Sequence, residues 1–346
     1  MVSKKKTKSR QKKDSVLSLG IDLGTSRSAV SASNGKREMV QSYVGWPKDF
    51  VAQKMLGKPV LFGAEALEHR LSLELVRPLA HGVIREGTER DEEAVGELLG
   101  HLVELVSRSP NDQIHAAVGV PAEALKVNRD AIKGAIAEFA DKLIVVSEPF
   151  SVAYGLAALD NSMIIDIGAG TIDFCIMHGA MPSEEDQRSL FTAGDYVDQQ
   201  LLDVLSENYP DSGFNINMVR KFKEKHGFVG EPSKKVVANV PVHGKEMIHD
   251  ITEEVRRACE SIMPAMAETM MDMIARFDPE YQEKVRNNII LAGGGSQIDG
   301  IEDYLENATA DFAPCKFSRV RDALFAGSDG ALELAKDMPP EYWADI

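Results

Sequence analysis

Two stretches of this sequence share one construction: SVLSLGIDLGTSRSAVSAS at residues 15–33 and MIIDIGAGTIDFCIM at residues 163–177. In each, a short apolar run ends at an aspartate, Asp22 or Asp166, and a turn of small residues leads into a second apolar run. Such runs predict buried strands, and each pair predicts a hairpin. Because the unit occurs twice, the sequence predicts two homologous half-structures that each present one turn.

The turns carry the groups that bind phosphate. Glycine lets the backbone approach a phosphate closely, while exposed N–H groups and hydroxyls donate to its oxygens. One such turn also fits an ordinary hairpin, but two facing turns can hold a polyphosphate from both sides. The predicted phosphate-binding residues are Gly24, Thr25 and Ser26 in the first turn and Gly168, Ala169, Gly170 and Thr171 in the second.

The aspartates at the ends of the two strands predict a magnesium site. Mg²⁺ keeps several of its waters and takes one or two carboxylates. Asp22 and Asp166 are therefore expected to share one hydrated Mg²⁺ that neutralises the β- and γ-phosphates, with Asp173 flanking the second turn.

Glu148 is the candidate for activating water. It follows the apolar run LIVVS at residues 143–147 and precedes Pro149, which fixes the backbone beside it. Hydrolysis needs a group that orients and polarises the attacking water. Glu148 and Asp166 form the predicted catalytic pair; the alternative for Glu148 is a surface glutamate or an ion-pair partner.

A third glycine-rich segment, NNIILAGGGSQIDGI, covers residues 287–301. Three glycines after an apolar strand let a base or ribose lie flat against the backbone near a helix N-terminus. The predicted contacts here are Gly293, Gly294, Gly295 and Gln297.

Strand and helix patterns alternate along the rest of the chain, which predicts an α/β fold. Residues 38–44 predict a strand, and a loop-rich region with Pro47, Gly57, Pro59 and Gly63 follows it. We expect Trp343 to pack back on the first half. The remaining predicted elements are strands at 114–120, 143–149 and 235–241 and helices at 91–107, 129–140, from about 151, 195–208, 216–226 and 251–276, the last rich in Met.

Composition limits the function. A length of 346 residues favours two domains, and a net charge of −15 argues against general nucleic-acid binding. No apolar stretch is long enough to span a membrane, and the three cysteines and eight histidines show no metal-ligand spacing. Residues 1–14 carry seven basic residues against one acid and predict a disordered arm. The arm is a solubilising tail, or it docks to acidic lipid or to a neighbouring subunit.

Three motifs of the chain resemble, in order, the two phosphate motifs and the adenosine motif of the actin, Hsp70 and sugar-kinase superfamily. They are GIDLGTS, DIGAGTID and LAGGGSQIDG. The resemblance implies an actin-like ATPase fold, with two ribonuclease-H-like domains around a cleft for ATP or ADP with Mg²⁺. FKEKHGFVG, at 222–230, resembles the actin segment whose Lys–Glu pair lies beside adenine and ribose, which implies that role for Lys223 and Glu224. The implied domains are 15–160 with 322–346, and 161–321, after the arm at 1–14.

Within the superfamily the chain is most similar to the actin-like proteins of bacterial magnetosomes. The similarity rests on six segments: VGWPKD (44–49), GVPA (119–122), SEPFSVAYG (147–155), MPSEEDQ (181–187), KEKHGFVG (223–230) and MPPEYW (338–343). A further segment, AGDYVD (193–198), resembles the superfamily segment that leads into the first helix of the second domain. The similarity to the magnetosome proteins implies a cytoplasmic, cytoskeletal ATPase that forms head-to-tail filaments along the magnetosome chain with magnetosome-associated adaptors. One departure is Ile172, where related sequences often have Thr.

Three alternatives stay open. A plasmid-segregating or shape-determining bacterial actin differs mainly in its partners. A small-molecule kinase of the same fold would need a substrate pocket with a catalytic aspartate. An Hsp70-like chaperone would need a peptide-binding domain after the ATPase, for which the sequence given leaves no room.

Overall fold

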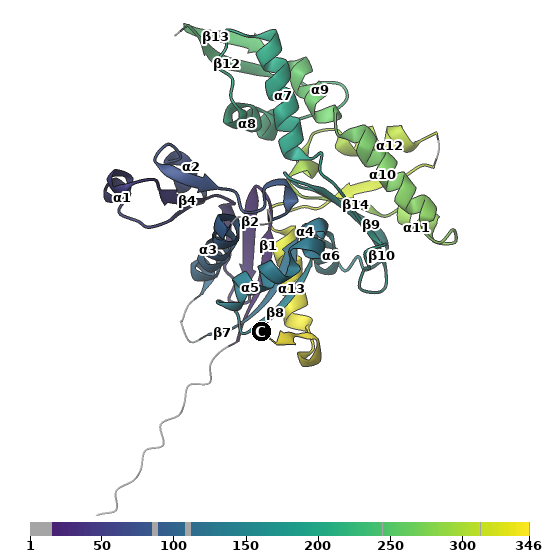
Figure 1. Cartoon of the computed structure of the whole chain (residues 1–346). Coiled ribbons are helices and arrows are strands. Elements are labelled where there is room, and N and C mark those ends of the chain that lie inside the picture. Colours follow the sequence, from purple (N-terminus) through teal and green to yellow (C-terminus); the bar gives the residue numbers. More distant parts are fainter. Residues whose placement is uncertain (1–15, 85–88, 108–111, 244, 312, 346) are drawn as a thin grey trace, which may run out of the picture.

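A computed structural model of the chain describes residues 16–84, 89–107, 112–243, 245–311 and 313–345. The predicted basic arm at 1–14 lies outside the described residues. Two large sheets form the centre of the molecule, and helices cover their outer faces and fill the space between them (Figure 1). This arrangement is the α/β fold of two similar halves that the sequence predicted.

The first sheet has the strand order β16-β8-β7-β1-β2-β3. Strands β1, β2 and β3 form an antiparallel meander, and β7 and β8 add parallel to it on the β1 side. The bounds are β1 Val16–Leu23, β2 Arg27–Ala32, β3 Arg37–Gln41, β7 Gln113–Val120, β8 Lys142–Ser147 and β16 Ala344–Asp345.

The second sheet repeats this construction in the order β11-β10-β9-β14-β15. An antiparallel meander, β9-β10-β11, is again extended by parallel strands, here β14 and β15. The duplication predicted from the two hairpins is thus confirmed in the strand order. The bounds are β9 Asp160–Ile167, β10 Ile172–His178, β11 Gln187–Leu190, β14 Ile289–Ala292 and β15 Phe317–Arg319.

Two helices, α6 (Glu148–Gly155) and α13 (Ala326–Asp337), lie between the sheets and contact each other. They approach so closely that a Cβ on Gly155 would lie 2.7 Å from the Cα of Gly330. Small residues are therefore required at this crossing. The other helices of the first half are α3 (Glu89–Val106), α4 (Ala122–Val127) and α5 (Arg129–Ala137). The helices of the second half include α7 (Gly194–Asn208), α8 (Ile216–His226), α11 (Gln282–Arg286) and α12 (Ile301–Thr309).

The region predicted to be loop-rich is instead a small three-stranded sheet with two short helices. Residues 38–44 do not form one strand, because β3 ends at Gln41 and β4 begins at Val44. The chain pairs locally around a small core of Tyr43, Leu61, Ala66 and Leu73, which scattered Pro and Gly conceal in the sequence. The elements are β4 Val44–Pro47, α1 Phe50–Leu56, β5 Leu61–Phe62, α2 Gly63–Glu68 and β6 Leu73–Val76.

The sequence predicted one long Met-rich helix over 251–276, and this prediction is wrong, because the segment forms two helices. It consists of α9 (Thr252–Glu260) and α10 (Met263–Arg276), and Pro264 stands in the first turn of α10. Proline lacks an N–H and clashes with the preceding turn, so one helix cannot run through it. The methionines Met263, Met266, Met270 and Met273 are buried in the core of the second half, so they serve as packing residues.

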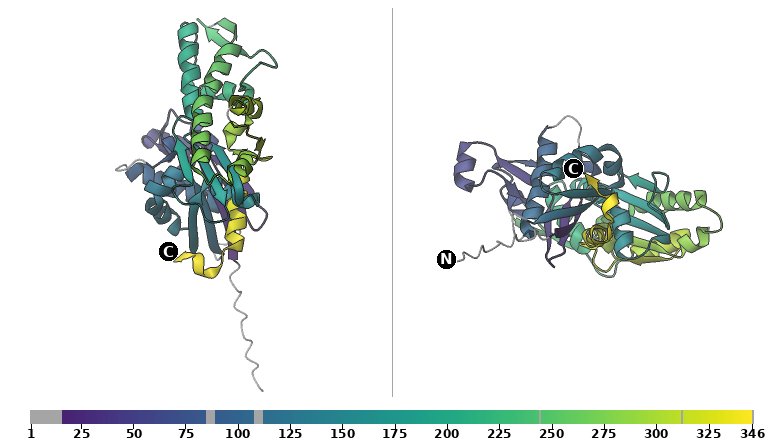
Figure 2. Two further views of the ribbon diagram at one scale, coloured as in Figure 1. Left: turned by 90° about the vertical axis from the view of Figure 1, so that its right-hand side faces the viewer. Right: turned by 90° about the horizontal axis from the view of Figure 1, so that it is seen from below.

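The molecule has two further elements at its ends. A hairpin of β12 (Val237–Val242) and β13 (Lys245–Asp250) lies at the end opposite the C-terminus (Figure 2). Trp343 packs on the first half as predicted, because its ring lies 5.3 Å from that of His115 in β7. Of the helices in the described ranges, none combines the length and the apolar character that crossing a membrane requires.

Candidate functional site

One cavity between the two halves is lined by every residue that the sequence predicted for the nucleotide, the metal and the catalytic pair. The segments come from both sheets and from helices, and they are spread over positions 22 to 297 of the chain. These residues are Asp22, Gly24, Thr25, Ser26, Glu148, Asp166, Gly168, Ala169, Gly170, Thr171, Lys223, Glu224, Gly293, Gly294, Gly295 and Gln297.

The two hairpin turns face each other and touch. A Cβ on Gly170 would lie 2.5 Å from Oγ1 of Thr25, so only glycine fits against the first turn here. The Oγ of Ser42 donates to the Gly24 carbonyl at 2.7 Å, and the Gly168 N–H donates to the Thr171 carbonyl at 2.9 Å. Each turn is therefore held within its own half, and their backbone groups border a shared space.

Strand register places the carboxylates at the inner ends of the sheets. Asp22 pairs with Gly119 of β7, and Asp166 pairs with Ala292 of β14, directly before the glycine-rich segment. Gly293, with φ of 72°, lies so close to Asp166 that a Cβ would overlap with its Oδ1. The third motif thus lies beside the second turn, which the sequence alone did not establish.

The glycine-rich segment forms a short 3-10 helix, η2 (Gly294–Gln297), after β14. Ser296 Oγ donates to the Gly293 carbonyl at 2.7 Å, and Gln297 Nε2 donates to Ser296 Oγ at 3.0 Å. These bonds hold the loop in shape from within, and the glycine backbone stays accessible to the cavity.

Glu148 is the first residue of α6, which begins three residues earlier than predicted, with Pro149 in its first turn. Its side chain is only 7% exposed. Its Oε1 atom is buried and has no hydrogen-bond partner among the described residues. A buried acceptor without a partner is costly, and a water molecule in the cavity would satisfy it.

Burial shifts the carboxyl pKa values upward. It raises the pKa of Asp22 to about 6, while a side-chain hydrogen bond with Glu148 opposes the shift. Burial raises the pKa of Glu148 and Asp166 well above the ordinary range, and the neighbouring negative charges add to it. Like charges taken out of water disfavour ionisation, so a cation bound beside these carboxylates would favour their ionised forms.

Asp173 has a larger part in the site than the sequence indicated. Its carboxylate accepts from Thr171 Oγ1 at 2.7 Å, from the Ala122 N–H at 3.2 Å, and from Ser189 Oγ. Burial raises its pKa, and these hydrogen bonds oppose the shift. Because Ala122 belongs to the first half, Asp173 connects the second turn to the opposite side of the cavity.

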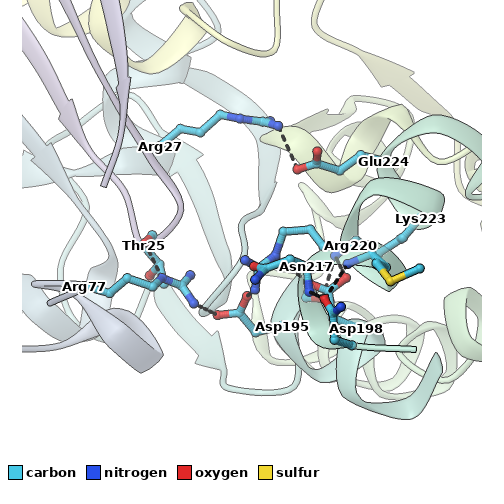
Figure 3. A network of polar contacts seen from close by, with 12 residues as sticks. Thr25, Arg27, Arg77, Asp195, Asp198, Asn217, Arg220, Lys223 and Glu224 are labelled. Carbon is cyan, nitrogen blue, oxygen red and sulfur yellow. Dashed lines mark hydrogen bonds and ion pairs between the residues drawn. The ribbon is translucent and has the colours of Figure 1, made fainter. Parts of the chain in front are cut away.

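Lys223 and Glu224 line the cavity but contact different groups. Lys223 Nζ donates to the Gly194 carbonyl at 2.7 Å and pairs with buried Asp198 at 2.7 Å. Glu224 Oε1 accepts from Arg27 Nη2 at 2.7 Å across the cleft (Figure 3). The segment thus borders the cavity, and both side chains have protein partners there.

A second crossing of the cleft was missed by sequence reasoning. Arg77, after β6, pairs with Asp195 at 2.9 Å, and Arg220 of α8 reaches both Asp195 and the hydroxyl of Tyr43 (Figure 3). Arg220 and Lys223 both contact Asp198, which their i, i+3 spacing could have indicated. No local pattern marks Arg77.

Direct metal ligation is not what the cluster offers. Across the described ranges, no three His, Cys, Asp or Glu side chains are grouped so that they could hold a metal ion. Asp22 and Asp166, on opposite sides of the cavity, fit a hydrated Mg²⁺, which needs only one or two carboxylates.

Comparison with known proteins agrees with this geometry. The family model described as MreB/Mbl protein matches residues 16–318. The actin-like protein MamK of Paramagnetospirillum magneticum is 42% identical over 330 residues, which cover 95% of each chain.

Solved structures give the same result. A chain of the MamK double helical filament has a TM-score of 0.90 at 42% identity, covering 93% of this chain and 99% of that one. A non-polymerising mutant of MamK bound to AMPPNP has a TM-score of 0.74 at 41% identity, covering 94% and 100%. From the fold, the shared cavity and these similarities together, the chain is a member of the MreB/Mbl family of actin-like proteins.

Proposed function

We propose that this protein is a filament-forming bacterial actin that binds ATP with Mg²⁺ in the cavity, hydrolyses it, and organises magnetosome chains. The observation that carries the proposal is the meeting of two phosphate-type turns, two strand-end aspartates and a buried glutamate in one cavity. The related MamK structures, one a filament and one bound to AMPPNP, support both parts of it.

In this proposal the two turns hold the triphosphate from both halves. The first turn supplies the N–H groups and hydroxyls of residues 24–26, and the second supplies those of residues 168–171. Asp22 and Asp166 would hold Mg²⁺ through its waters. Asp22 and Asp166 both line the cavity, and burial raises the pKa of both carboxyl groups, so a cation beside them would offset an unfavourable charge and the residues fit the ion. Mg²⁺ would supply charge neutralisation at the β- and γ-phosphates.

Glu148 would orient the attacking water. Its free, buried Oε1 offers an acceptor inside the cavity. Asp22 and Asp166 contribute to the raised pKa of Glu148, so a cation beside them would favour the ionised form that accepts a proton from water. The ADP left after hydrolysis would then be held by fewer contacts than ATP.

Adenosine would lie against Gly293–Gly295 and Gln297, next to Lys223 and Glu224. Both of these side chains have partners in the structure, so adenosine binding requires Glu224 to exchange its bond with Arg27 for one to the nucleotide. Asp198 would keep Lys223 in position.

We infer that residues 15–160 with 322–346 form one domain and residues 161–321 the other. ATP bound between them would favour a closed shape that stacks head to tail, and a heterologous contact without rotational closure gives an open filament. By analogy with MamK, the filament would lie in the cytoplasm along the magnetosome chain and would engage magnetosome-associated adaptors.

The experiment is to incubate the purified full-length protein with Mg²⁺ and ATP, ADP or no nucleotide. Phosphate release, sedimentation and electron microscopy are then followed on the same samples. The proposal expects phosphate release, and filaments that depend on ATP. Absence of both would contradict it. Phosphate transfer to an added sugar, without filaments, would favour the kinase instead.

A further inference from the structure

We propose that Arg77 is a positioning residue that ties the two phosphate turns together across the cleft. Four side chains take part, and we call them the cross-cleft network: Tyr43, Arg77, Asp195 and Arg220. The inference deepens the proposed function and rests on it, because it assigns a task in ATP hydrolysis to a residue outside the three sequence motifs.

Arg77 is bonded to the first turn. Its Nε donates to the backbone carbonyl of Thr25 at 3.2 Å. Thr25 is the residue whose hydroxyl lies against Gly170 of the second turn. Any movement of the Arg77 guanidinium therefore acts on the backbone of the first turn directly.

The same guanidinium reaches the second turn through Asp195. Arg77 Nη1 lies 2.9 Å from Asp195 Oδ2. The backbone of Asp195 is in turn locked to the second turn, because its N–H donates to the Ala169 carbonyl at 2.8 Å. The N–H of the preceding residue, Gly194, donates to the Gly168 carbonyl at 3.1 Å. Arg77 thus spans from one turn to the residue that is fixed to the other (Figure 3).

Arg220 closes the network from the opposite half. Its Nη2 donates to Asp195 Oδ1 at 3.2 Å, and its Nη1 donates to the Tyr43 hydroxyl at 3.1 Å. The Tyr43 ring lies 5.8 Å from the Arg77 guanidinium, within range of a cation–π contact. Asp195 is therefore held by two arginines, one from each half.

The cross-cleft network is more deeply buried than the other contact across the cleft, the pair of Arg27 and Glu224. The side chains of Arg77 and Arg220 are each 17% exposed, whereas Arg27 and Glu224 are 33% and 40% exposed. Charge-assisted bonds gain strength as water is excluded, so the cross-cleft network is the firmer connection. Arg77 Nη2 is also buried with no partner among the described residues, and a water molecule would satisfy it.

Removing the link should misalign the turns while leaving their own donors in place. Hydrolysis depends on the relative position of the reacting groups, and a shift of about 1 Å can lower a rate about 100-fold. Saturating ATP cannot restore that alignment, so the loss should appear in kcat more than in KM.

The test compares Arg77→Gln with wild type in steady-state phosphate release and in the release rate of a fluorescent ATP analogue. We expect kcat to fall about 100-fold and the analogue to leave about tenfold faster, so KM should rise by no more than about tenfold. Values within twofold of wild type, or full recovery at saturating ATP, would overturn the assignment.

A double-mutant cycle tests whether Arg77 acts through Asp195. If it does, Arg77→Gln combined with Asp195→Asn should be no slower than the slower single variant, within about twofold. Losses that multiply would show that the two act separately, which overturns the link.

Two further variants keep the test interpretable. Arg90→Gln is the matched control, because Arg90 pairs with Glu74 and Glu93 away from the cavity and should leave kcat and KM unchanged. Should Arg77→Gln fail to fold by circular dichroism, Arg77→Lys takes its place. A single ammonium cannot make both bonds of the guanidinium, so at least a threefold loss in kcat is expected.

Failure of the proposed function would look different. A wild-type protein that binds the analogue but releases no phosphate would contradict the ATPase, and the analogue release rates would still decide the role of Arg77. Absence of nucleotide binding by the wild type would overturn both proposals.

Discussion

At the scale of single residues, the cavity brings together carboxyl groups that repel one another. Glu148 is buried, and Asp22 and Asp166 are half-buried beside it at the meeting point of the two halves. The charges of Asp22 and Asp166 raise the pKa of Glu148, and the charge of Asp22 raises that of Asp166. Such an arrangement is unfavourable without a cation, and active sites often carry instability of this kind. The tasks proposed for Glu148 and Asp166 differ, and each leads to a prediction.

Replacement of Glu148 by Gln should separate binding from hydrolysis. The amide keeps the size of the side chain but cannot accept a proton from water, so phosphate release should fall by about 100-fold or more. Nucleotide binding and assembly should persist, because the turns are unchanged. Phosphate release under single-turnover conditions measures the effect, with exposed Glu283→Gln in α11 as the control. Wild-type turnover in Glu148→Gln would remove Glu148 from the mechanism.

Replacement of Asp166 by Asn should stabilise the nucleotide-free protein. The folded-state pKa of Asp166 is raised, chiefly by burial. An acid with a raised folded pKa contributes stability that is present at low pH and is lost as the pH rises through that pKa. At pH 7.5 we therefore expect Asp166→Asn to unfold at higher temperature, with a gain of about 1 kcal/mol.

The stability gain expected for Asp166→Asn should also depend on pH. The gain of Asp166→Asn over wild type should shrink as the pH is lowered toward 5, because the wild-type carboxyl group then takes up its proton. Thermal unfolding without nucleotide at several pH values measures it, and Asp311→Asn, in the exposed turn after α12, is the control. A variant less stable than wild type at pH 7.5 would argue against the buried charge.

At the scale of elements, the crossing of α6 and α13 sets how the halves meet. A Cβ on Gly330 would overlap with the carbonyl oxygen of Ser151, and a Cβ on Gly155 would lie too close to the Cα of Gly330. Glu148 begins α6, and Asp22 lies against Gly327 in the first turn of α13. The packing of these two helices therefore positions part of the cavity.

Gly330→Ala should destabilise the protein through this crossing. The added methyl group must push two backbones apart, which costs about 1–3 kcal/mol. Gly134→Ala is the matched control, since nothing lies within 4 Å of a Cβ at this exposed position in α5, and it should stabilise by about 0.5–1 kcal/mol. Urea midpoints measure both. Equal shifts in the two variants would contradict a tight crossing.

Elements with a local signal were predictable from sequence. The hairpins around Asp22 and Asp166 were found because apolar runs, aspartate and small-residue turns are adjacent in the chain. The break between α9 and α10 was missed although Pro264 marks it, because the apolar pattern continues across it. The small sheet of β4, β5 and β6 was missed because its strands are two to four residues long and pair only through tertiary contacts.

Residues of the site were likewise predictable where they belong to a local sequence motif, and were missed where they meet only through distant contacts. Motif residues such as Thr25 and Gly293 were named from sequence, and all of them line the cavity. The cross-cleft network was not found, because Arg77 meets Thr25 across 52 positions and Arg220 meets Tyr43 across 177. Contacts of that separation leave no periodicity in the chain, and only the folded arrangement of the two sheets brings them together.

At the scale of the whole molecule, one sheet construction occurs twice and the cavity lies where its two copies face each other. Every polar bridge over the cleft therefore bears on how far the halves can open. A ligand shifts such an equilibrium only by its difference in affinity for the two states. In the proposed function, a Mg²⁺-nucleotide that touches both turns at once would bind the closed state better, and this would couple hydrolysis to filament assembly.

The most direct test of this account is the affinity of a fluorescent ATP analogue, measured with Mg²⁺ and with excess EDTA in wild type and in Asp166→Ala. We predict that Mg²⁺ tightens binding at least tenfold in wild type, which corresponds to about 1.4 kcal/mol, and that Asp166→Ala loses most of this gain. An affinity independent of both Mg²⁺ and Asp166 would contradict the shared clamp.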